Sequence, residues 1–299
     1  MKSKSKLANL KQLVRIRKPI LSSKKRRVSR ANTIYDLRAA AKKCTPRGPF
    51  DYTDGAADQE ITINKARRSF ENIEFQPHIL RDVSSATLAT TMLGKQYSMP
   101  VGIAPTGFTR MMNTEGEIAG SGAASAFGIP FTLSTMGTTS IENVAKNAPN
   151  GSNYFQLYLW RDRDRSLELI QRAEKAGYDG LVLTVDAQVA GARLRDVRNG
   201  LTVPPTLTAA TFLNALPRPN WWWNFLTKEP LDFASLGSWN GTVAQLMDTM
   251  FDPSMTYKDL AWIREIWPKK LIVKGVQRVD DAVKCAEYGA DAIVLSNHG

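Results

Sequence analysis

The sequence predicts an α/β fold with parallel strands, of the barrel type, and three observations lead to it. Short apolar runs rich in β-branched residues recur from residue 99 onward, and helical patterns such as 166–176 and 279–288 separate most of them. Strands that alternate with helices of about 10 to 15 residues indicate βαβ units. The runs are almost continuously apolar, which is typical of strands buried on both faces. With 299 residues and 43% hydrophobic content, the chain is long enough to bury one large core.

The expected elements follow one another along the chain. Asn32 or Thr33 is expected to cap a helix that begins directly after it. The six expected strands span residues 99–104, 129–134, 154–159, 180–185, 271–274 and 292–295. Residues 187–255 form a long insertion between the fourth and fifth strands, and insertions of this size usually carry function or lack order. Its run Trp221-Trp222-Trp223 fits either a membrane-interface anchor or packing on the barrel or at a subunit contact.

The net charge of +12 comes entirely from the N-terminal segment. Residues 1–30 contain twelve Lys or Arg and no acid, whereas the rest of the chain holds 28 basic and 28 acidic residues. We therefore expect a basic extension over residues 1–30 and one domain over residues 31–299. The extension fits a solvated tail, a segment bound to an anionic membrane surface, where each Lys or Arg contributes about 1 kcal/mol, or a nucleic-acid or organelle-targeting segment. Specific nucleic-acid binding is disfavoured, because the basic residues do not interleave with aromatics and the body is neutral.

Several function classes are disfavoured by what the sequence lacks. No apolar run reaches the roughly 18 to 20 residues that a transmembrane helix needs. Cys44 and Cys285 are far apart and match no metal-site spacing, so we expect no metal and two thiols in a reducing compartment. No Gly-x-Gly-x-x-Gly opens a helix after the first strand, which argues against a Rossmann nicotinamide site.

Polar or special residues stand at the carboxyl ends of all six expected strands, where α/β barrels carry their active sites. These residues are Pro105, Thr106, Ser134, Gln156, Tyr158, Thr184, Lys274 and His298. A lone Thr or Ser after a strand also fits a helix cap, and Lys274 alone also fits a solvated charge, but the complete set indicates a site.

The chemistry of this set points to oxidation of a 2-hydroxy acid. Hydroxyl and amide groups from Ser134, Gln156 and Thr184 suit the edge of a planar heteroaromatic ring, and Lys274 would stabilise negative charge on that ring. The imidazole of His298 suits a base, because the unperturbed pKa of imidazole, about 6.5, lies near working pH. Arg193 follows the fourth strand and is suited to holding a carboxylate in a bidentate fork. The cofactor would then supply the redox chemistry, and the protein orientation and electrostatics.

Seven segments carry a resemblance to a known family. They are Phe50-Asp51-Tyr52, Gly102-Ile103-Ala104-Pro105-Thr106-Gly107, Thr132-Leu133-Ser134, Tyr154-Phe155-Gln156-Leu157-Tyr158, Leu183-Thr184-Val185-Asp186, Ile272-Val273-Lys274-Gly275 and Leu295-Ser296-Asn297-His298-Gly299. From about residue 30 to its end, the chain resembles the FMN-dependent α-hydroxy-acid dehydrogenases and oxidases. Residues 191–200 and the long insertion look most like bacterial respiratory L-lactate dehydrogenases. The resemblance implies a TIM (β/α)8 barrel of the FMN-dependent type that is incomplete, with about six of the eight βα units present.

The resemblance also implies roles for individual residues. Those implied to contact the flavin are Pro105, Thr106, Gly107, Ser134, Gln156, Thr184, Lys274 and Ser296. Tyr52, Tyr158 and Arg193 would bind the substrate, and His298 would accept either its α-hydrogen or its hydroxyl proton. Met136 departs from the family where some relatives carry a bulky aromatic residue near the substrate, and the spacing from Tyr52 to Gly55 is one residue shorter than in plant-type oxidases. Family members continue beyond Ser-Asn-His-Gly with a second substrate-binding Arg and the loops that bind the FMN phosphate, so we expect little activity from these 299 residues alone.

The function expected from the resemblance is FMN-dependent oxidation of L-lactate to pyruvate, with electrons passed to a quinone or a cytochrome. Two alternatives stay open, namely a 2-hydroxy-acid oxidase that uses O2 and a non-catalytic remnant that binds membranes. We expect a homo-oligomer in the intact enzyme and a cytoplasmic location, peripheral on the cytoplasmic face of the inner membrane.

Overall fold

The computed structural model describes residues 20–200, 209–229, 231–235 and 249–299, and the chain divides into two compact units, residues 1–44 and 45–299. In the first unit, α2 spans Ser23–Val28 and α3 spans Ile34–Cys44. Thr33 and Asp36 cap α3 reciprocally: Asp36 N–H donates to Thr33 Oγ1 at 3.2 Å, and Thr33 N–H donates to Asp36 Oδ2 at 3.0 Å. The helix therefore begins where the sequence predicted, with Thr33 as its cap.

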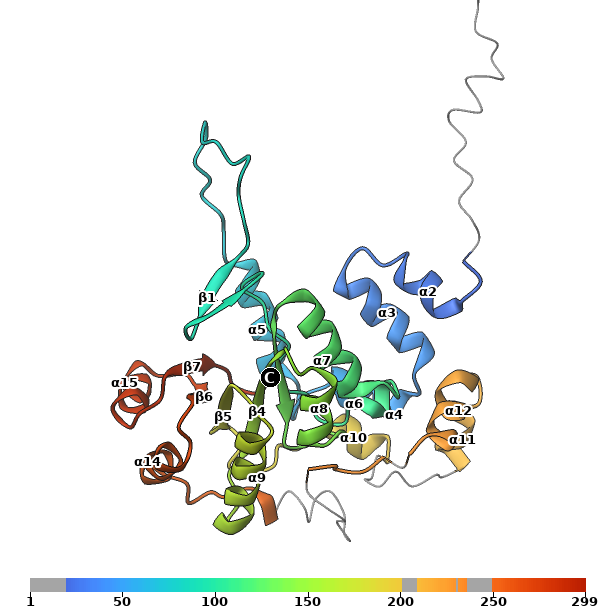
Figure 1. Cartoon of the computed structure of the whole chain (residues 1–299). Helices are drawn as coiled ribbons and strands as arrows, with labels where there is room; N and C mark the ends of the chain where they lie inside the picture. The colour runs from blue at the N-terminus through green and yellow to red at the C-terminus, as the bar shows by residue number, and fades with distance from the viewer. Residues whose placement is uncertain (1–19, 201–208, 230, 236–248) are drawn as a thin grey trace, which may run out of the picture. The chain divides into compact units, whose positions relative to one another are not determined.

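The second unit contains the strands, and its elements are shown in Figure 1. The described strands are β1 Thr90–Met92, β2 Lys95–Tyr97, β3 Pro130–Ser134, β4 Ser152–Tyr158, β5 Gly180–Thr184, β6 Lys270–Val276 and β7 Ala292–Leu295. The described helices are α4 Arg47–Asp54, α5 Ile61–Glu71, α6 Thr109–Met112, α7 Gly116–Phe127, α8 Ile141–Asn147, α9 Arg163–Lys175, α10 Leu194–Arg198, α11 Ala209–Ala215, α12 Pro219–Thr227, α14 Tyr257–Ile266 and α15 Val279–Glu287.

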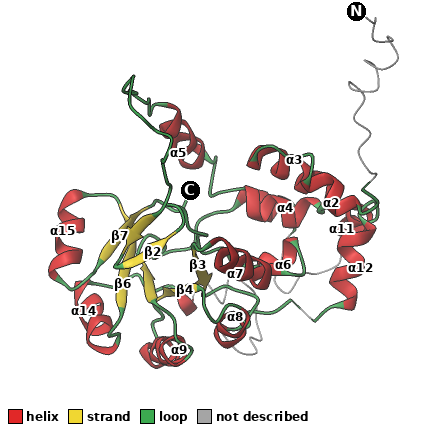
Figure 2. Cartoon of the chain, turned by 45° about the horizontal axis from the view of Figure 1, so that its top comes forward, coloured by secondary structure: helices red, strands yellow, loops and turns green. Residues whose placement is uncertain are grey.

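Strands β3 to β7 form one parallel sheet in sequence order, β3-β4-β5-β6-β7. Figure 2 shows α8, α9, α14 and α15 along one face of this sheet. Ser134 pairs in register with Gln156, and Thr184 with both Tyr158 and Lys274. Because parallel strands end at the same edge, this register brings the carboxyl ends of neighbouring strands together.

The first expected strand, residues 99–104, is not a strand in the structure. Ile103 alone forms a bridge, with Phe131 of β3, and Val101 is exposed. Pro100 and Pro105 enclose the segment, and proline cannot donate a hydrogen bond to a neighbouring strand, which limits pairing here. The five other expected strands are present, with ends that differ by up to two residues.

The two faces of the sheet bury different side chains. The face toward the helices packs Leu133, Phe155, Leu157, Leu181 and Leu271 into the main core, and all five are fully buried. Side chains alternate along a strand, so the residues between them point to the opposite face. There, Tyr154, Val182 and Ile272 form a second, smaller cluster.

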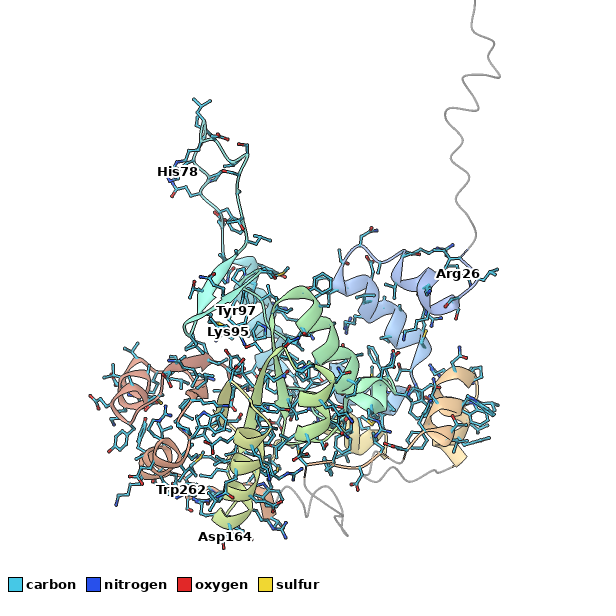
Figure 3. The ribbon with its side chains drawn as sticks, viewed as in Figure 1. Arg26, His78, Lys95, Tyr97, Asp164 and Trp262 are labelled. Carbon is cyan, nitrogen blue, oxygen red and sulfur yellow. The ribbon has the colours of Figure 1, made fainter. Side chains whose placement is uncertain are left out.

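The hairpin β1–β2 is bound to the amino ends of the strands. Tyr97 Oη lies 2.8 Å from Ser152 Oγ and 2.9 Å from Tyr154 Oη. Lys95 Nζ lies 2.7 Å from Asp179 Oδ2, and Figure 3 labels both hairpin residues. The hairpin therefore covers one end of β4 and leaves the carboxyl ends free.

The long insertion carries helices in its described parts, whereas residues 201–208, 230 and 236–248 lie outside the described residues. The three tryptophans fall within α12. Trp221 Nε1 donates to Met111 O at 2.8 Å and its ring stacks on Phe225 at 5.2 Å, whereas Trp223 is exposed. Within this run, Trp221 therefore packs against other parts of the protein, whereas Trp223 contributes to its surface.

Candidate active site

A row of buried polar side chains crosses the carboxyl ends of β3, β4 and β5. Ser134 Oγ donates to Gln156 Oε1 at 3.1 Å, and Gln156 Nε2 donates to Thr184 Oγ1 at 3.0 Å. Gln156 and Thr184 lie two residues beyond Tyr154 and Val182, on the same face of the sheet. Along the middle of the strands this face of the sheet is apolar, and it presents hydrogen-bonding side chains at the carboxyl ends of the strands. The row offers donors and acceptors side by side to a planar ring.

The next two strands continue the row with a cation and a hydroxyl. Lys274 Nζ donates to Ser296 Oγ at 3.1 Å. The pairing of β6 with β7 shifts register between Lys274 and Val276, so a bulge forms at Gly275, which has a φ of +113°. A Cβ at Gly275 would lie 2.6 Å from the Cβ of Asp186. Glycine is therefore required here, both for its backbone conformation and for the approach of Asp186.

Asp186 connects the base predicted from the sequence with the predicted lysine. His298 Nδ1 lies 2.7 Å from Asp186 Oδ1, and Lys274 Nζ lies 3.7 Å from Asp186 Oδ2. A carboxylate only accepts hydrogen bonds, so a neutral His298 carries its proton on Nδ1, and its unprotonated Nε2 acts as an acceptor. Tyr158 Oη lies 3.1 Å from His298 Nε2. His298 is therefore oriented from both sides, with its basic nitrogen toward Tyr158.

Tyr52 and Arg193 form a second pair of the predicted residues. The Arg193 guanidinium lies over the Tyr52 ring, 4.9 Å from its centroid, and also donates to the Tyr52 backbone carbonyl. Asp196 Oδ2 lies 2.6 Å from Arg193 Nε. Arg193 is thus held in one orientation by its own segment and by α4.

The site shifts the pKa of four of its groups. Burial raises the pKa of Tyr52 to about 12, although the nearby charge of Arg193 opposes the shift. Burial also raises the pKa of Tyr158, so both phenols remain protonated at neutral pH. Burial lowers the pKa of Lys274, and Asp186 partly opposes this. Burial alone would raise the pKa of Asp186, but the hydrogen bond and charge of His298, together with the charge of Lys274, bring it below its usual value.

The remaining predicted residues lie in the loop between the Ile103 bridge and α6. Thr106 is exposed, whereas Pro105 and Gly107 are half-buried. A Cβ at Gly107 would lie 2.9 Å from Met136 Cβ and 3.6 Å from Tyr52 Oη. The structure therefore places Gly107 beside both the substrate-binding candidate Tyr52 and Met136. Within the described part of the chain, no hydrogen bond or ion pair joins Pro105 or Thr106 to the other candidates.

Asp186 is the residue that sequence reasoning missed as a functional group. Its segment, Leu183-Thr184-Val185-Asp186, was recognised only as a motif. The position of this acid, close after a strand end, could have indicated its role. The candidate base of the chain is an imidazole, and such a base commonly needs a carboxylate partner. Local pattern could not show that Asp186 meets His298, because the two residues are 112 positions apart in the chain.

A family profile described as FMN-dependent dehydrogenase matches residues 41–299. The chain belongs to the FMN-dependent dehydrogenase family. A Mycobacterium tuberculosis protein named "Putative L-lactate dehydrogenase" is 54% identical over 291 residues, which cover 97% of this chain and 70% of that protein. The L-lactate dehydrogenase of Ectopseudomonas mendocina is 39% identical over 271 residues, 88% of this chain and 71% of that protein. The crystal structure of the monotopic membrane protein (S)-mandelate dehydrogenase matches with a TM-score of 0.86 at 35% identity, over 90% of this chain and 73% of that one.

The cofactor of this FMN-dependent dehydrogenase is therefore FMN, and its sheet is part of a TIM barrel, as the sequence predicted. The described residues form a five-stranded portion of that barrel. The flavin ring carries alternating carbonyl and nitrogen groups along one edge. The amide of Gln156, the hydroxyls of Ser134 and Thr184 and the ammonium of Lys274 supply matching donors and acceptors. The donor set at this edge of the sheet thus fits the ring of the cofactor.

Proposed function

We propose that this chain oxidises L-lactate to pyruvate at the carboxyl edge of its sheet. The observation that carries the proposal is the His298 imidazole, held between the Asp186 carboxylate and the Tyr158 hydroxyl, beside the cation Lys274. Both sequence relatives described above bear the name L-lactate dehydrogenase. Their name supplies the substrate, and the arrangement of these side chains suits the chemistry.

Binding of the substrate would depend on Arg193, Tyr52 and Tyr158. The Arg193 guanidinium suits a carboxylate, because its donors form a planar fork. Two phenols that stay protonated add neutral donors for the carboxylate or hydroxyl oxygens. The substrate would thus be oriented with its hydroxyl-bearing carbon near His298.

Proton transfer would fall to His298. Conversion of a 2-hydroxy acid to a 2-oxo acid releases two electrons and two protons. His298 Nε2 would accept one proton, either from the α-carbon or from the hydroxyl, and Asp186 would stabilise the resulting imidazolium. FMN, when bound, would supply the acceptor for the two electrons and for the second proton. Lys274, whose ammonium belongs to the row of Ser134, Gln156 and Thr184, would oppose negative charge there.

The direct test is a spectrum of the purified chain with added FMN, followed by anaerobic addition of L-lactate. We expect L-lactate to bleach the protein-bound flavin of the chain, slowly because little activity is expected from these 299 residues alone. In a His298→Ala variant we expect the flavin absorbance to stay unbleached. Bleaching in that variant at the wild-type rate would contradict the role proposed for His298. Bound flavin that no 2-hydroxy acid bleaches would contradict the proposed reaction.

For the electron acceptor, we propose a quinone or a cytochrome, with O2 as the alternative. Stopped-flow mixing of the reduced protein with O2, with a soluble quinone or with cytochrome c separates them. Reoxidation that is fast with quinone or cytochrome and slow with O2 supports a dehydrogenase, and the reverse order shows an oxidase. We also propose that the intact enzyme is a homo-oligomer, which sedimentation velocity measures.

We propose that α11 and α12 bind a membrane surface peripherally. Across the described ranges, every helix is too short or too polar to span a bilayer. The two helices contact each other, and the exposed apolar residues on them and on the turn between them are Phe212, Leu213, Leu216, Trp223 and Leu226. Exposed apolar and indole side chains suit the interfacial zone, and the basic extension, residues 1–30, would add attraction to anionic lipid.

Vesicle co-sedimentation tests this surface with Trp223→Ser and Leu226→Ser. Phe75→Ser is the matched control, because Phe75 is also exposed but lies outside these helices. Binding that falls in the first two variants and not in the control supports the proposal, and equal binding in all three contradicts it. A chain that binds vesicles but reduces no flavin would correspond to the non-catalytic alternative.

A further inference from the structure

The segment that carries Arg193 is held mainly by polar contacts. Its helix α10 spans five residues, Leu194–Arg198, and buries none of them. Val197 is exposed. The carbonyl of Ala192 accepts a hydrogen bond from the N–H of Asp58 at 2.8 Å, and Asn199 Nδ2 donates to an α4 carboxylate at 2.8 Å. A segment without buried apolar residues opens locally unless such contacts hold it.

Arg195 makes the most extensive of these contacts, because its guanidinium meets three carboxylates. Its Nη1 lies 3.2 Å from Asp54 Oδ2 and 3.6 Å from Asp51 Oδ1, and its Nη2 is hydrogen-bonded to Glu60 Oε2. The three acidic side chains are at most 15% exposed. Burial alone would lower the pKa of Arg195, but the hydrogen bonds to Glu60 and Asp54, together with the charge of Glu60, outweigh this effect and raise the pKa. The guanidinium thus stays charged, and it offsets repulsion among three nearby acids.

The position of these acids links Arg195 to the substrate-binding candidates. Asp51 directly precedes Tyr52 on α4, and Asp54 follows it by two residues. Arg195 itself lies two residues after Arg193. Since Arg193 lies over the Tyr52 ring at 4.9 Å, the ion pairs of Arg195 and this stacking fix the same two segments together.

The turn after α4 is shaped around Arg195. A Cβ at Gly55 would lie 2.6 Å from Asp51 O, 3.1 Å from Arg195 Cδ and 3.1 Å from Glu60 Oε1. Glu60 adopts a φ of +60°, in the left-handed region that non-glycine residues rarely occupy. Its Oε1 also accepts the N–H of Ala56 at 3.2 Å. An unfavourable backbone conformation persists only where surrounding contacts impose it, so the turn and Arg195 depend on each other.

We propose that Arg195 is a positioning residue for the substrate carboxylate: it fastens the segment 192–199 to α4 and so keeps Arg193 and Tyr52 in a preformed pair. The proposal rests on the function proposed above for Arg193 and Tyr52. Without Arg195, the segment opens, and the substrate binds to a clamp that must first be assembled. The apparent affinity for the 2-hydroxy acid is then the affinity of the formed clamp multiplied by the fraction of molecules in which the clamp is formed.

Amide hydrogen exchange of the purified chain, with no substrate or cofactor, tests the structural step. In Arg195→Gln we expect exchange over residues 192–199 to accelerate at least about tenfold, the factor equivalent to about 1.4 kcal/mol. The β4 peptide should be unchanged. Arg195→Lys, which keeps the charge but not the fork, should give an intermediate rate. Arg47→Gln is the control, because Arg47 also pairs with Asp51, at 3.3 Å, but lies on α4 itself.

The result that overturns the proposal is unchanged exchange over residues 192–199 in Arg195→Gln, or the same acceleration in Arg47→Gln. If Arg195→Gln loosens every peptide, Arg195→Lys decides: acceleration confined to residues 192–199 supports the proposal, and any other pattern overturns it. Turnover adds a second readout. We expect the KM for L-lactate to rise about tenfold or more with little change in kcat, and Arg195→Lys to recover part of the loss.

Failure of the proposed function is distinguishable from failure of this inference. Flavin that the wild-type chain binds but that L-lactate does not reduce contradicts the function, whereas the exchange measurement still decides whether Arg195 fastens the segment. A wild-type chain that is active, with Arg195→Gln unchanged in both KM and exchange, overturns only the role of Arg195.

Discussion

Replacement of Asp186 by Asn removes the negative charge beside His298 while preserving the size of the side chain. Asp186 Oδ1 lies 2.7 Å from His298 Nδ1, and the carboxylate is 8% exposed. Once His298 accepts a proton from the substrate, an imidazolium faces this carboxylate. The substitution therefore removes an interaction that strengthens as the reaction proceeds, which is the kind that accelerates catalysis.

The magnitude follows from the distance and the exposure. Two unit charges about 4 Å apart, at an effective dielectric constant near 20, attract by about 4 kcal/mol. The His298 side chain is 42% exposed, and solvent screening reduces the attraction to about 2 kcal/mol. A loss of about 2 kcal/mol in transition-state stabilisation corresponds to flavin reduction that is about 30-fold slower.

The assay is anaerobic stopped-flow reduction of the bound flavin by saturating L-lactate. Asp179→Asn is the matched control: Asp179 also pairs with a lysine, Lys95 at 2.7 Å, but at the other end of the strands, so we expect a wild-type rate. A rate for Asp186→Asn within about threefold of wild type would show that the carboxylate does not stabilise the imidazolium.

The same variant has a readout that needs no turnover. The chain contains two histidines, and the second one, His78, is exposed and serves as the reference in one nitrogen-15 NMR spectrum. We expect neutral His298 to carry its proton on Nδ1 in the wild type. In Asp186→Asn we expect a mixture of tautomers, because an amide can donate as well as accept. Identical spectra for the two proteins would refute the orienting role of Asp186.

Three further predictions concern the surroundings of this pair. Burial lowers the pKa of Lys274, so its charge is lost as pH rises through a value below the usual 10.5, and the pH–rate profile of flavin reduction should fall there. In Lys274→Arg this alkaline fall should move to higher pH, and a fall at the same pH would show that another group causes it. Gly275→Ala should lower the unfolding free energy in urea by about 1 to 3 kcal/mol and slow flavin reduction, because its Cβ would lie 2.6 Å from Asp186. Gly177→Ala, at a φ of +84° with open space around it, should lower stability alone, so an equal slowing of flavin reduction in both variants would contradict this reasoning. Ile170→Ala should lower the unfolding free energy by about 2 to 5 kcal/mol, since Ile170 is fully buried on α9, and a loss below about 1 kcal/mol would show that the core collapses around it.

Local pattern was sufficient for much of the fold and part of the site. Alternation along each strand places Tyr154 and Gln156, or Val182 and Thr184, on one face, so the polar row could be expected from the sequence. The prediction of a strand over residues 99–104 was wrong for a local reason, since Pro100 and Pro105 restrict strand pairing around Ile103. Apolar character alone did not distinguish a strand from an extended segment with one bridge.

The contacts that complete the site could not be derived in this way. Asp186 and His298 are 112 residues apart, and Asp186 lies against the bulge at Gly275, which leaves no periodic trace in the sequence. Arg195 is 141 residues from Asp54 and 135 from Glu60. Side-chain type predicts that an arginine pairs with acids, but not which acids the folded chain brings to it.

Patterns in the sequence were enough to establish the alternation of strands and helices, the family, and the row of polar residues at the strand ends. These depend on neighbours a few residues apart, whose geometry the backbone repeats at every strand. The carboxylate that orients His298 and the ion pairs that fasten Arg193 beside Tyr52 became known from the folded structure. Such pairings join distant segments, and their distances are set by strand register, a bulge and a turn rather than by any local period.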